Sequence, residues 1–339
     1  MTLLESSRLQ FTSGLNICRI LNGLWQVAGG HGQINPKAAV QEMFDYYDDG
    51  FTTWDLADHY GPAEDFIGEF RRQLQEAHDP DSLGQIQALT KWVPRPGRMT
   101  RQVVESNIAF SLRRIDVETL DLLQFHWWDY ADDRYLDALK HLTDLKEEGK
   151  IRHLALTNFD TEHLRIIIEH GVEIVSNQVQ FSLVDRRPEI AMVPFCLEHG
   201  IQLLTYGTVC GGLLSEYYLG RREPRNWSLK TASQQKYKQM IDAWGGWKLF
   251  QELLNCLKQI ADKQHVSIAN VATRYILDKP SVAGVILGTR LGVSEHRDEN
   301  ARTFTLSLNE EAHGHIQAVL GKANDVFQSI GDCGDEYRN

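Results

Sequence analysis

The chain has 339 residues, of which 42% are hydrophobic, 24% charged and 9% aromatic. A chain of this size and composition buries roughly three quarters of its unfolded surface, which excludes a disordered protein, a collagen helix and a coiled coil. The formal net charge is -11, and no run of Lys and Arg would neutralise a row of phosphates, so we expect no nucleic-acid partner.

The first element predicted along the chain is a small hairpin. Residues 9–11 and 16–18 form short runs on either side of Ser13 and Gly14, a pair typical of a tight turn. We expect this hairpin to cover the floor of the fold that follows.

Eight short apolar or β-branched runs come next, each bounded by turn residues and followed by a helical pattern. They span residues 19–23, 51–54, 86–90, 120–125, 151–156, 172–179, 201–205 and 282–287. Helix signals include Asn35 and Pro36 as a cap and first turn, and Gly149 and Gly171 as helix ends. This alternation predicts parallel βα units, and eight of them close a TIM (β/α)8 barrel.

The main rival is a doubly wound open sheet that binds a nucleotide. That fold requires a Gly-x-Gly-x-x-Gly turn after its first strand, and the Gly-Gly-His-Gly of residues 29–32 lacks this spacing. No low-complexity linker marks a domain boundary. We therefore expect one α/β barrel domain over residues 1–339.

One connection is much longer than the others. Polar residues at the ends of successive strands lie 20 to 36 positions apart, but 84 positions separate Tyr206 from Arg290. The spacing predicts a long insertion after the seventh strand. Its first part, residues 215–247, is rich in Tyr and Trp, and we expect a lid or specificity element at the carboxyl face of the barrel.

Polar side chains follow nearly every predicted strand. Asp55, Lys91 and His126 come after the second, third and fourth runs, while Asn158 and Gln178 lie at the ends of the fifth and sixth. A charged residue at such a position is costly unless it has a use, because the interior of a barrel is apolar. Since the carboxyl ends of the strands share one face, we expect these side chains to converge there.

Tyr60, in the loop after Asp55, adds a phenol to this group. A phenol with a pKa near 10 is a poor acid at neutral pH, but a nearby ammonium favours the phenolate and lowers that pKa. We expect Lys91 to act on Tyr60 in this way, Asp55 to neutralise Lys91, and His126 to orient a substrate oxygen by a hydrogen bond. Such a group suits proton transfer to a carbonyl oxygen as a hydride reaches the carbon, or the reverse.

The motifs around these residues resemble the aldo-keto reductase superfamily. The matching stretches lie in order at residues 50–61, 91, 121–127, 156–159, 176–178 and 288–300, so that the resemblance covers roughly residues 15–305. It implies a barrel enzyme that uses NADPH to reduce aldehydes and ketones. It also implies a catalytic tetrad of Asp55, Tyr60, Lys91 and His126, with Tyr60 as general acid/base.

The resemblance further implies residues that bind cofactor and substrate. Asn158 and Gln178 match the ligands of the nicotinamide carboxamide, Tyr206 the aromatic ring under the nicotinamide, His296 a residue near the 2'-phosphate, and Asn300 the motif after the eighth strand. Substrate-pocket positions are assigned to Trp25, Trp92 and Trp127. These tryptophans, and Trp128, are equally consistent with packing in the barrel wall.

The segment after the eighth strand suits a phosphate on independent grounds. Barrel enzymes often bind phosphate between the loops after strands seven and eight, at the N-terminus of a short helix. Gly288, Thr289 and Arg290 precede such a predicted helix, and Arg290 and Arg297 offer positive charge for a 2'-phosphate. These residues favour NADP(H) as cofactor, with NAD(H) as the alternative.

Two other functions are compatible with such a chain. One is a regulatory or sensor subunit that binds a nicotinamide cofactor with little turnover, and the other is a hydrolytic or lyase barrel. The latter lacks the metal ligands that such a barrel would usually need, so we expect no metal site. The reductase hypothesis predicts a small carbonyl compound as the partner, and the sequence predicts no oligomeric state.

The cellular setting is predicted from the cysteines and from the absence of targeting patterns. Five cysteines are scattered along the chain with no Cys-x-x-Cys pair, which argues against a disulfide framework. Residues 1–14 have no basic segment followed by an apolar run, and no run approaches the ~18 apolar residues of a membrane span. We therefore expect a cytoplasmic protein that does not enter a membrane.

Overall fold

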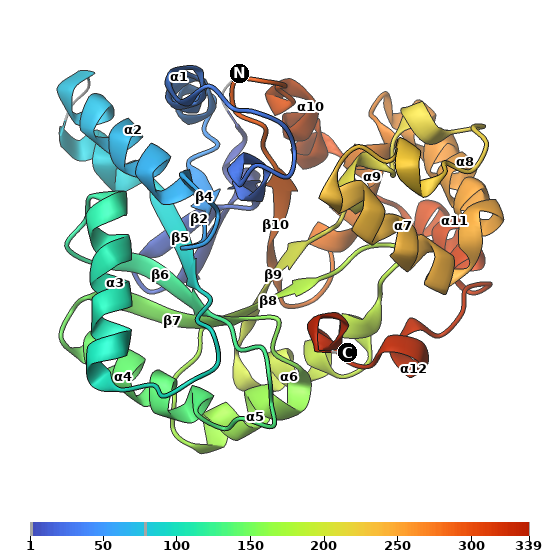
Figure 1. The fold of residues 1–339 in the computed structure, drawn as a ribbon. Helices are drawn as coiled ribbons and strands as arrows, with labels where there is room; N and C mark the ends of the chain where they lie inside the picture. The colour runs from blue at the N-terminus through green and yellow to red at the C-terminus, as the bar shows by residue number, and fades with distance from the viewer. Residues whose placement is uncertain (1–2, 78–79, 339) are drawn as a thin grey trace.

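Eight parallel strands form a closed barrel in the computed structural model, which describes residues 3–77 and 80–338. Around the barrel the strands follow the order β10-β3-β4-β5-β6-β7-β8-β9 (Figure 1). Their bounds are β3 Ile20–Gly23, β4 Thr53–Asp55, β5 Gln87–Trp92, β6 Leu120–Phe125, β7 Ile151–Thr157, β8 Ser176–Gln180, β9 Gln202–Tyr206 and β10 Val282–Gly288. The predicted TIM barrel is confirmed.

Helices surround this barrel, and most of them follow a strand directly. They are α1 Pro36–Asp48, α2 Ala63–Ala77, α3 Arg101–Ile115, α4 Tyr135–Glu147, α5 Thr161–Glu169, α6 Met192–His199, α7 Ala232–Trp244, α8 Gly246–Gln264, α9 Ile268–Leu277, α10 Arg297–Arg302, α11 Glu310–Leu320 and α12 Val326–Ile330. In the described part of the chain, no helix has the length and apolar character that crossing a membrane requires.

The predicted N-terminal hairpin is also confirmed. Strands β1 Arg8–Thr12 and β2 Leu15–Cys18 pair antiparallel, and Gly14 takes a positive φ of 73° at the turn. Apolar residues of the hairpin, such as Phe11 and Ile17, join one buried cluster with inward-facing residues of the barrel such as Leu122. The hairpin therefore closes the interior of the barrel at one end.

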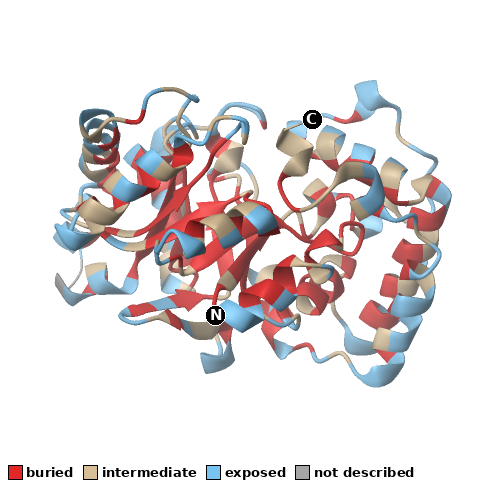
Figure 2. Cartoon of the chain, turned by 90° about the horizontal axis from the view of Figure 1, so that it is seen from below, coloured by how far each residue is buried: buried red, intermediate tan, exposed pale blue. Residues whose placement is uncertain are grey.

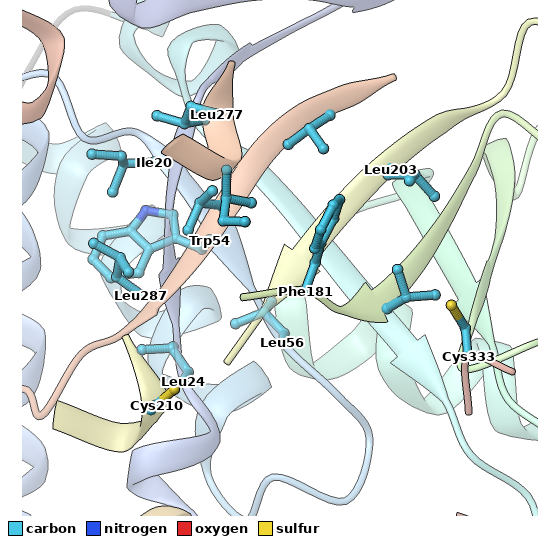
Figure 3. Close-up of a cluster of buried hydrophobic side chains, with 14 of the residues drawn as sticks. Ile20, Leu24, Trp54, Leu56, Phe181, Leu203, Cys210, Leu277, Leu287 and Cys333 are labelled. Carbon is cyan, nitrogen blue, oxygen red and sulfur yellow. The ribbon is translucent and has the colours of Figure 1, made fainter. Parts of the chain in front are cut away.

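A second apolar layer lies between the strands and the surrounding helices. Residues alternate along each strand between the two layers, as the period of a β-strand requires. Figure 3 shows part of the outer layer, including Ile20, Trp54 and Leu287. Figure 2 shows the result for the whole chain, with buried residues concentrated along the strands and exposed residues on the outer helical faces.

The sixth predicted strand begins later than the sequence pattern indicated. The prediction was residues 172–179, whereas β8 starts at Ser176. The backbone N–H of Val172 still donates to the carbonyl oxygen of Ile167, 3.3 Å away at the end of α5. The apolar residues from 172 onward therefore first complete the end of a helix, and only Val175 turns its N–H to a β7 carbonyl.

The predicted insertion after the seventh strand is present and is largely helical. Helices α7, α8 and α9 all lie between β9 and β10. With α11 they gather on one side of the barrel (Figure 1). Several aromatic residues of the insertion are buried within this helical group, including Tyr237, Trp244 and Trp247, whereas Trp227 is exposed.

Candidate active site

A cavity of about 860 Å³ opens beside the carboxyl ends of the barrel strands. It is lined by twelve of the fifteen residues that the sequence assigned to a site: Trp25, Asp55, Tyr60, Lys91, His126, Asn158, Gln178, Tyr206, Gly288, Arg290, His296 and Asn300. Residues from β4, β5, β8, β9 and β10 thus meet in one space, as the convergence of parallel strands predicts.

Three of the assigned residues do not line this cavity. Trp92 follows Lys91 on the opposite face of β5, and its ring packs 5.5 Å from that of Phe125. Trp127 is fully buried and donates its indole N–H to the carbonyl oxygen of Asp132 at 2.8 Å. Because neighbouring side chains in an extended segment point to opposite sides, the assignment of Trp92 and Trp127 to the substrate pocket is wrong.

The tryptophan that does reach the cavity beside His126 is Trp128, which is 39% exposed. Its ring lies edge-on, 4.4 Å from the imidazole of His126. The third residue outside the lining, Thr289, is buried, and its backbone N–H donates to the carbonyl oxygen of Gly23 at 2.9 Å. Thr289 therefore holds the loop after β10 to β3.

The Lys91 ammonium is fully committed to fixed partners. Its Nζ donates to the two carboxylate oxygens of Asp55 at 2.8 and 2.7 Å and to the carbonyl oxygen of Leu56 at 2.8 Å. Burial lowers the pKa of Lys91, whereas the Asp55 carboxylate acts to raise it. An ammonium has three protons, so Lys91 has none left for another acceptor in this arrangement.

Tyr60 meets Lys91 through its ring rather than through its hydroxyl. The Lys91 Nζ lies 4.9 Å from the centre of the Tyr60 ring. Burial raises the pKa of Tyr60 well above its ordinary value, and the Asp55 carboxylate raises that pKa further. The expectation that Lys91 lowers this pKa is therefore wrong for this structure, because Asp55 neutralises the ammonium. Tyr60 is a protonated phenol at neutral pH.

His126 is neutral, and its tautomer is fixed by a carbonyl group. Burial lowers its pKa to about 4. Its Nδ1 lies 3.0 Å from the Thr157 carbonyl oxygen, which can only accept, so Nδ1 carries the proton. The buried Nε2 has no hydrogen-bond partner among the described residues. A neutral imidazole with this tautomer accepts a hydrogen bond at Nε2.

Asn158 and Gln178 leave one donor and one acceptor unused. The Tyr206 hydroxyl donates to Asn158 Oδ1 at 2.7 Å, which leaves the Asn158 Nδ2 free for a ligand. Gln178 Nε2 donates to Asp55 Oδ1 at 2.7 Å and to Gln124 Oε1 at 2.6 Å, which leaves the Gln178 Oε1. A primary amide needs one partner of each kind, so these two side chains fit a carboxamide.

The far end of the cavity holds the loop after β10. Arg290 donates to the carbonyl oxygen of His31 at 2.7 Å and has no carboxylate within ion-pair distance in residues 3–77 and 80–338. Arg297 is not available for a ligand, because it pairs with Asp49 at 3.1 Å and with Glu295 at 3.3 Å. The expectation that both arginines offer free charge holds for Arg290 alone.

His296 at this end is also paired. Its Nδ1 lies 3.4 Å from the Glu299 carboxylate, which raises the pKa of His296. Gly288 lies beside Gln26, whose Nε2 would come within 2.2 Å of a Cβ at that position. No metal site adjoins this loop or any other part of the described chain, where no three His, Cys, Asp or Glu side chains are grouped to hold an ion.

Many other lining residues were not found from the sequence. Among them are Lys236 of α7 and Tyr337 of the C-terminal segment, and Lys236 Nζ donates to the Tyr337 hydroxyl. Neither follows a predicted barrel strand, which was the signal that identified the other residues. The richness of residues 215–247 in aromatic and basic side chains was the only hint of Lys236.

Comparisons with known proteins identify the family of the chain. The model of the Aldo/keto reductase family matches residues 19–320. The chain is 21% identical to the NADH-specific methylglyoxal reductase of Escherichia coli, over 88% of this chain and 93% of that protein. It is 28% identical to Flagellar radial spoke protein 5 of Chlamydomonas reinhardtii over 66% of this chain, but spans only about half, 49%, of that protein.

A solved structure shows the same fold. An aldo/keto reductase from Klebsiella pneumoniae, in complex with NADP and acetate, superposes with a TM-score of 0.69. It is 19% identical in sequence, and the match covers 93% of this chain and 95% of that one. At that identity the likeness concerns the fold.

Proposed function

Because the chain belongs to the aldo/keto reductase family, we propose that it reduces aldehyde or ketone carbonyls to alcohols with NAD(P)H, or catalyses the reverse reaction. The observation that carries this proposal is Tyr60, a protonated phenol that shares the cavity with the Lys91–Asp55 ion pair and the neutral His126. A general acid is what a carbonyl oxygen needs when a hydride is added to its carbon.

The cavity suits a nicotinamide cofactor. The free Nδ2 of Asn158 and the free Oε1 of Gln178 would bind the carboxamide, and the Tyr206 ring would lie against the nicotinamide. The unpaired Arg290 would face a phosphate, together with Gly288 and the side chains of His296 and Asn300. When bound, the reduced cofactor supplies a hydride to the carbonyl carbon.

The side chains then handle the proton. Tyr60 donates its hydroxyl proton to the carbonyl oxygen, which becomes the alcohol, and the phenolate then recovers a proton from the solvent. Lys91 packs against the Tyr60 ring and holds that ring in place, while Asp55 keeps the ammonium charged. The Nε2 of His126 accepts a hydrogen bond from the alcohol and so orients it.

Substitution of Tyr60 by Phe tests the mechanism. It removes the proton donor and leaves the ring over Lys91, so we expect the fold to persist and kcat for a generic aldehyde to fall by roughly 10²–10⁴-fold. Undiminished reduction by a folded Tyr60→Phe protein would contradict the mechanism. Tight NADPH binding by the wild-type protein, with no turnover across an aldehyde panel, would instead favour a cofactor-binding sensor subunit.

We propose NADP(H) as the preferred cofactor. The support is Arg290, a cation in the cavity lining without a carboxylate partner among the described residues. Substitution of Arg290 by Met is expected to raise KM for NADPH about tenfold and KM for NADH much less, because a 2'-phosphate contact is present only in NADPH. An equal effect on both cofactors would contradict this preference.

A further inference from the structure

One wall of the cavity carries an ammonium that no carboxylate of residues 3–77 or 80–338 neutralises. Lys236, in the second turn of α7, places its Nζ 4.3 Å from the ring centre of Tyr337, 5.0 Å from that of Tyr206 and 5.6 Å from that of Tyr237. Its hydrogen bond goes to the Tyr337 hydroxyl. Within the part of the chain that the structure describes, the ion pairs of the α7 lysines are those of Lys238 with Glu223 and Asp242, and none joins Lys236 to an Asp or Glu.

The other lysine of α7 shows how different this arrangement is. Lys238 is bound by Glu223 and by Asp242, each at 2.6 Å, and does not line the cavity. The acid next to Tyr337 in the chain, Glu336, is held at 3.0 Å by Arg187. Lys236 is thus the lysine of α7 whose charge is left for a ligand.

The C-terminal segment fixes the Tyr337 ring close to the groups that would act on a carbonyl. Arg338 donates to the carbonyl oxygens of Trp127 and Asn158, each at 2.7 Å. The Tyr337 hydroxyl lies 3.1 Å from that of Tyr206, and its ring centre lies 6.3 Å from that of His126. Lys236, Tyr337 and His126 therefore lie along the same cavity.

Aromatic rings stabilise a partly buried ammonium, but a carboxylate is a stronger partner for it. We propose that the carbonyl substrate carries a carboxylate, which binds the Lys236 ammonium beside Tyr337 while its carbonyl oxygen lies at the Tyr60 hydroxyl. This inference rests on the proposed reductase function. It names the class of substrate as an anionic aldehyde or ketone, such as an aldehyde acid.

A matched pair of aldehydes tests the inference. 4-Carboxybenzaldehyde carries the anionic group, and its methyl ester carries a neutral group of similar shape. We expect the wild-type enzyme to prefer the acid in kcat/KM. The Lys236→Met variant should lower the acid-to-ester ratio of kcat/KM at least tenfold through KM for the acid, Tyr337→Phe should lower it less, and Lys236→Arg should retain most of it.

Lys230→Met is the control, because it removes the same charge from an exposed lysine that does not line the cavity. A second readout needs no turnover: calorimetry with 4-(hydroxymethyl)benzoate should show binding at least tenfold weaker in Lys236→Met. An acid-to-ester ratio that Lys236→Met does not change would overturn the inference, and so would a rise confined to KM for the cofactor. Failure of the wild-type enzyme to reduce either aldehyde would contradict the proposed function itself.

Discussion

At the scale of single residues, the chemistry of the cavity depends on which side-chain protons already form hydrogen bonds within the protein. The three protons of Lys91 and the Nδ1 proton of His126 all point to fixed acceptors. Both amide protons of Gln178 are used as well. The hydroxyl of Tyr60 is therefore the proton donor of the tetrad that remains for a substrate.

This arrangement predicts how the reaction depends on pH. Burial raises the pKa of Tyr60 well above its ordinary value, so the phenol stays protonated across the neutral range. Reduction uses the protonated form, which is present below that pKa and lost above it. We therefore expect kcat/KM for reduction to be flat from about pH 6 to about pH 9, whereas alcohol oxidation, which needs the phenolate, rises with pH by up to about tenfold per unit.

Steady-state assays in both directions, with the same cofactor couple at several pH values, provide the measurement. A decline of reduction with a midpoint near pH 7 would contradict the assignment of the proton to Tyr60. His126 should not contribute a change in that range, because its pKa of about 4 keeps it neutral throughout.

The carboxamide contact predicts the effect of changing one atom of Asn158. Asn158→Asp keeps the oxygen that accepts from Tyr206 but loses the Nδ2 donor, and Asp tolerates the positive φ of 59° at this position. We expect NADPH binding, followed by quenching of protein fluorescence, to weaken about tenfold, the worth of one hydrogen bond of about 1.4 kcal/mol.

Asn107→Asp, the same substitution on the exposed face of α3, is the control and should leave NADPH binding unchanged. Equal binding by wild type and Asn158→Asp would mean that Asn158 does not hold the carboxamide.

The sequence located the residues that follow barrel strands but not their protonation. Asp55, Lys91 and His126 were found because a strand end fixes the position of a side chain. The protonation state of Tyr60 depends on burial and on the Asp55 carboxylate. Asp55 pairs with Lys91 and so neutralises the positive charge that the sequence alone placed beside Tyr60. Trp127 and Trp128 differ by one position, and only the actual path of the loop decides which of them faces the cavity.

At the scale of elements, α7 closes over a glycine-rich loop after β9. A Cβ on Gly207 would lie 2.7 Å from the Tyr237 ring, and one on Gly211 would lie 2.9 Å from the Ser233 Cβ. Ser233 also shares a 2.9 Å hydrogen bond with His31, from the segment between β3 and α1. The start of α7 can therefore lie against the loop only because these positions have no side chains.

The loop offers a matched pair of substitutions. Gly211 and Gly212 have positive φ angles of 61° and 87°, but a Cβ on Gly212 meets no atom within 4 Å. Both alanine variants should lose roughly 1 kcal/mol of unfolding free energy to backbone strain. Gly211→Ala should in addition displace α7 and weaken NADPH binding, because it pushes Ser233 away from the loop.

Titration of both variants with NADPH and thermal denaturation separate the two effects. Equal affinity of Gly211→Ala and Gly212→Ala would show that contact with α7 does not shape the cofactor site.

The sequence predicted which segments form strands more accurately than it predicted the residues at which those strands begin and end. Strands are predictable because alternating burial against two apolar layers imposes a period of two. The start of β8 was missed because the same apolar residues also complete the end of α5, and a pattern of hydrophobicity does not separate these uses. The helices of the insertion were not predicted, although apolar residues such as Leu253, Leu257 and Ile260 recur at helical spacing in α8.

At the scale of the whole molecule, the ends of the barrel sequence must be joined for the sheet to close. Strand β10 pairs with β3 on one side and β9 on the other, so that residues near positions 20 and 285 become neighbours. Arg19 reinforces this closure: its guanidinium donates to the carbonyl oxygens of Ala283 at 3.1 Å, Val282 at 2.9 Å and Leu277 at 2.7 Å.

Substitution of Arg19 is therefore expected to lower the stability of the protein without changing its activity. It precedes β3 at the amino end of the barrel, away from the cavity at the carboxyl ends. Arg19→Met keeps most of the aliphatic stem but leaves three carbonyl groups without their donor, so we expect a loss of roughly 2–4 kcal/mol in unfolding free energy and a lower Tm. The kcat of the folded enzyme should not change, because no cavity residue contacts Arg19 through these bonds. Arg8→Met is the control: in the described part of the chain the Arg8 side chain makes one hydrogen bond, to the Thr52 hydroxyl at 2.8 Å, and its removal should cost less than about 1 kcal/mol. Equal losses of stability in the two variants would mean that Arg19 does not strengthen the junction between the first and last strands.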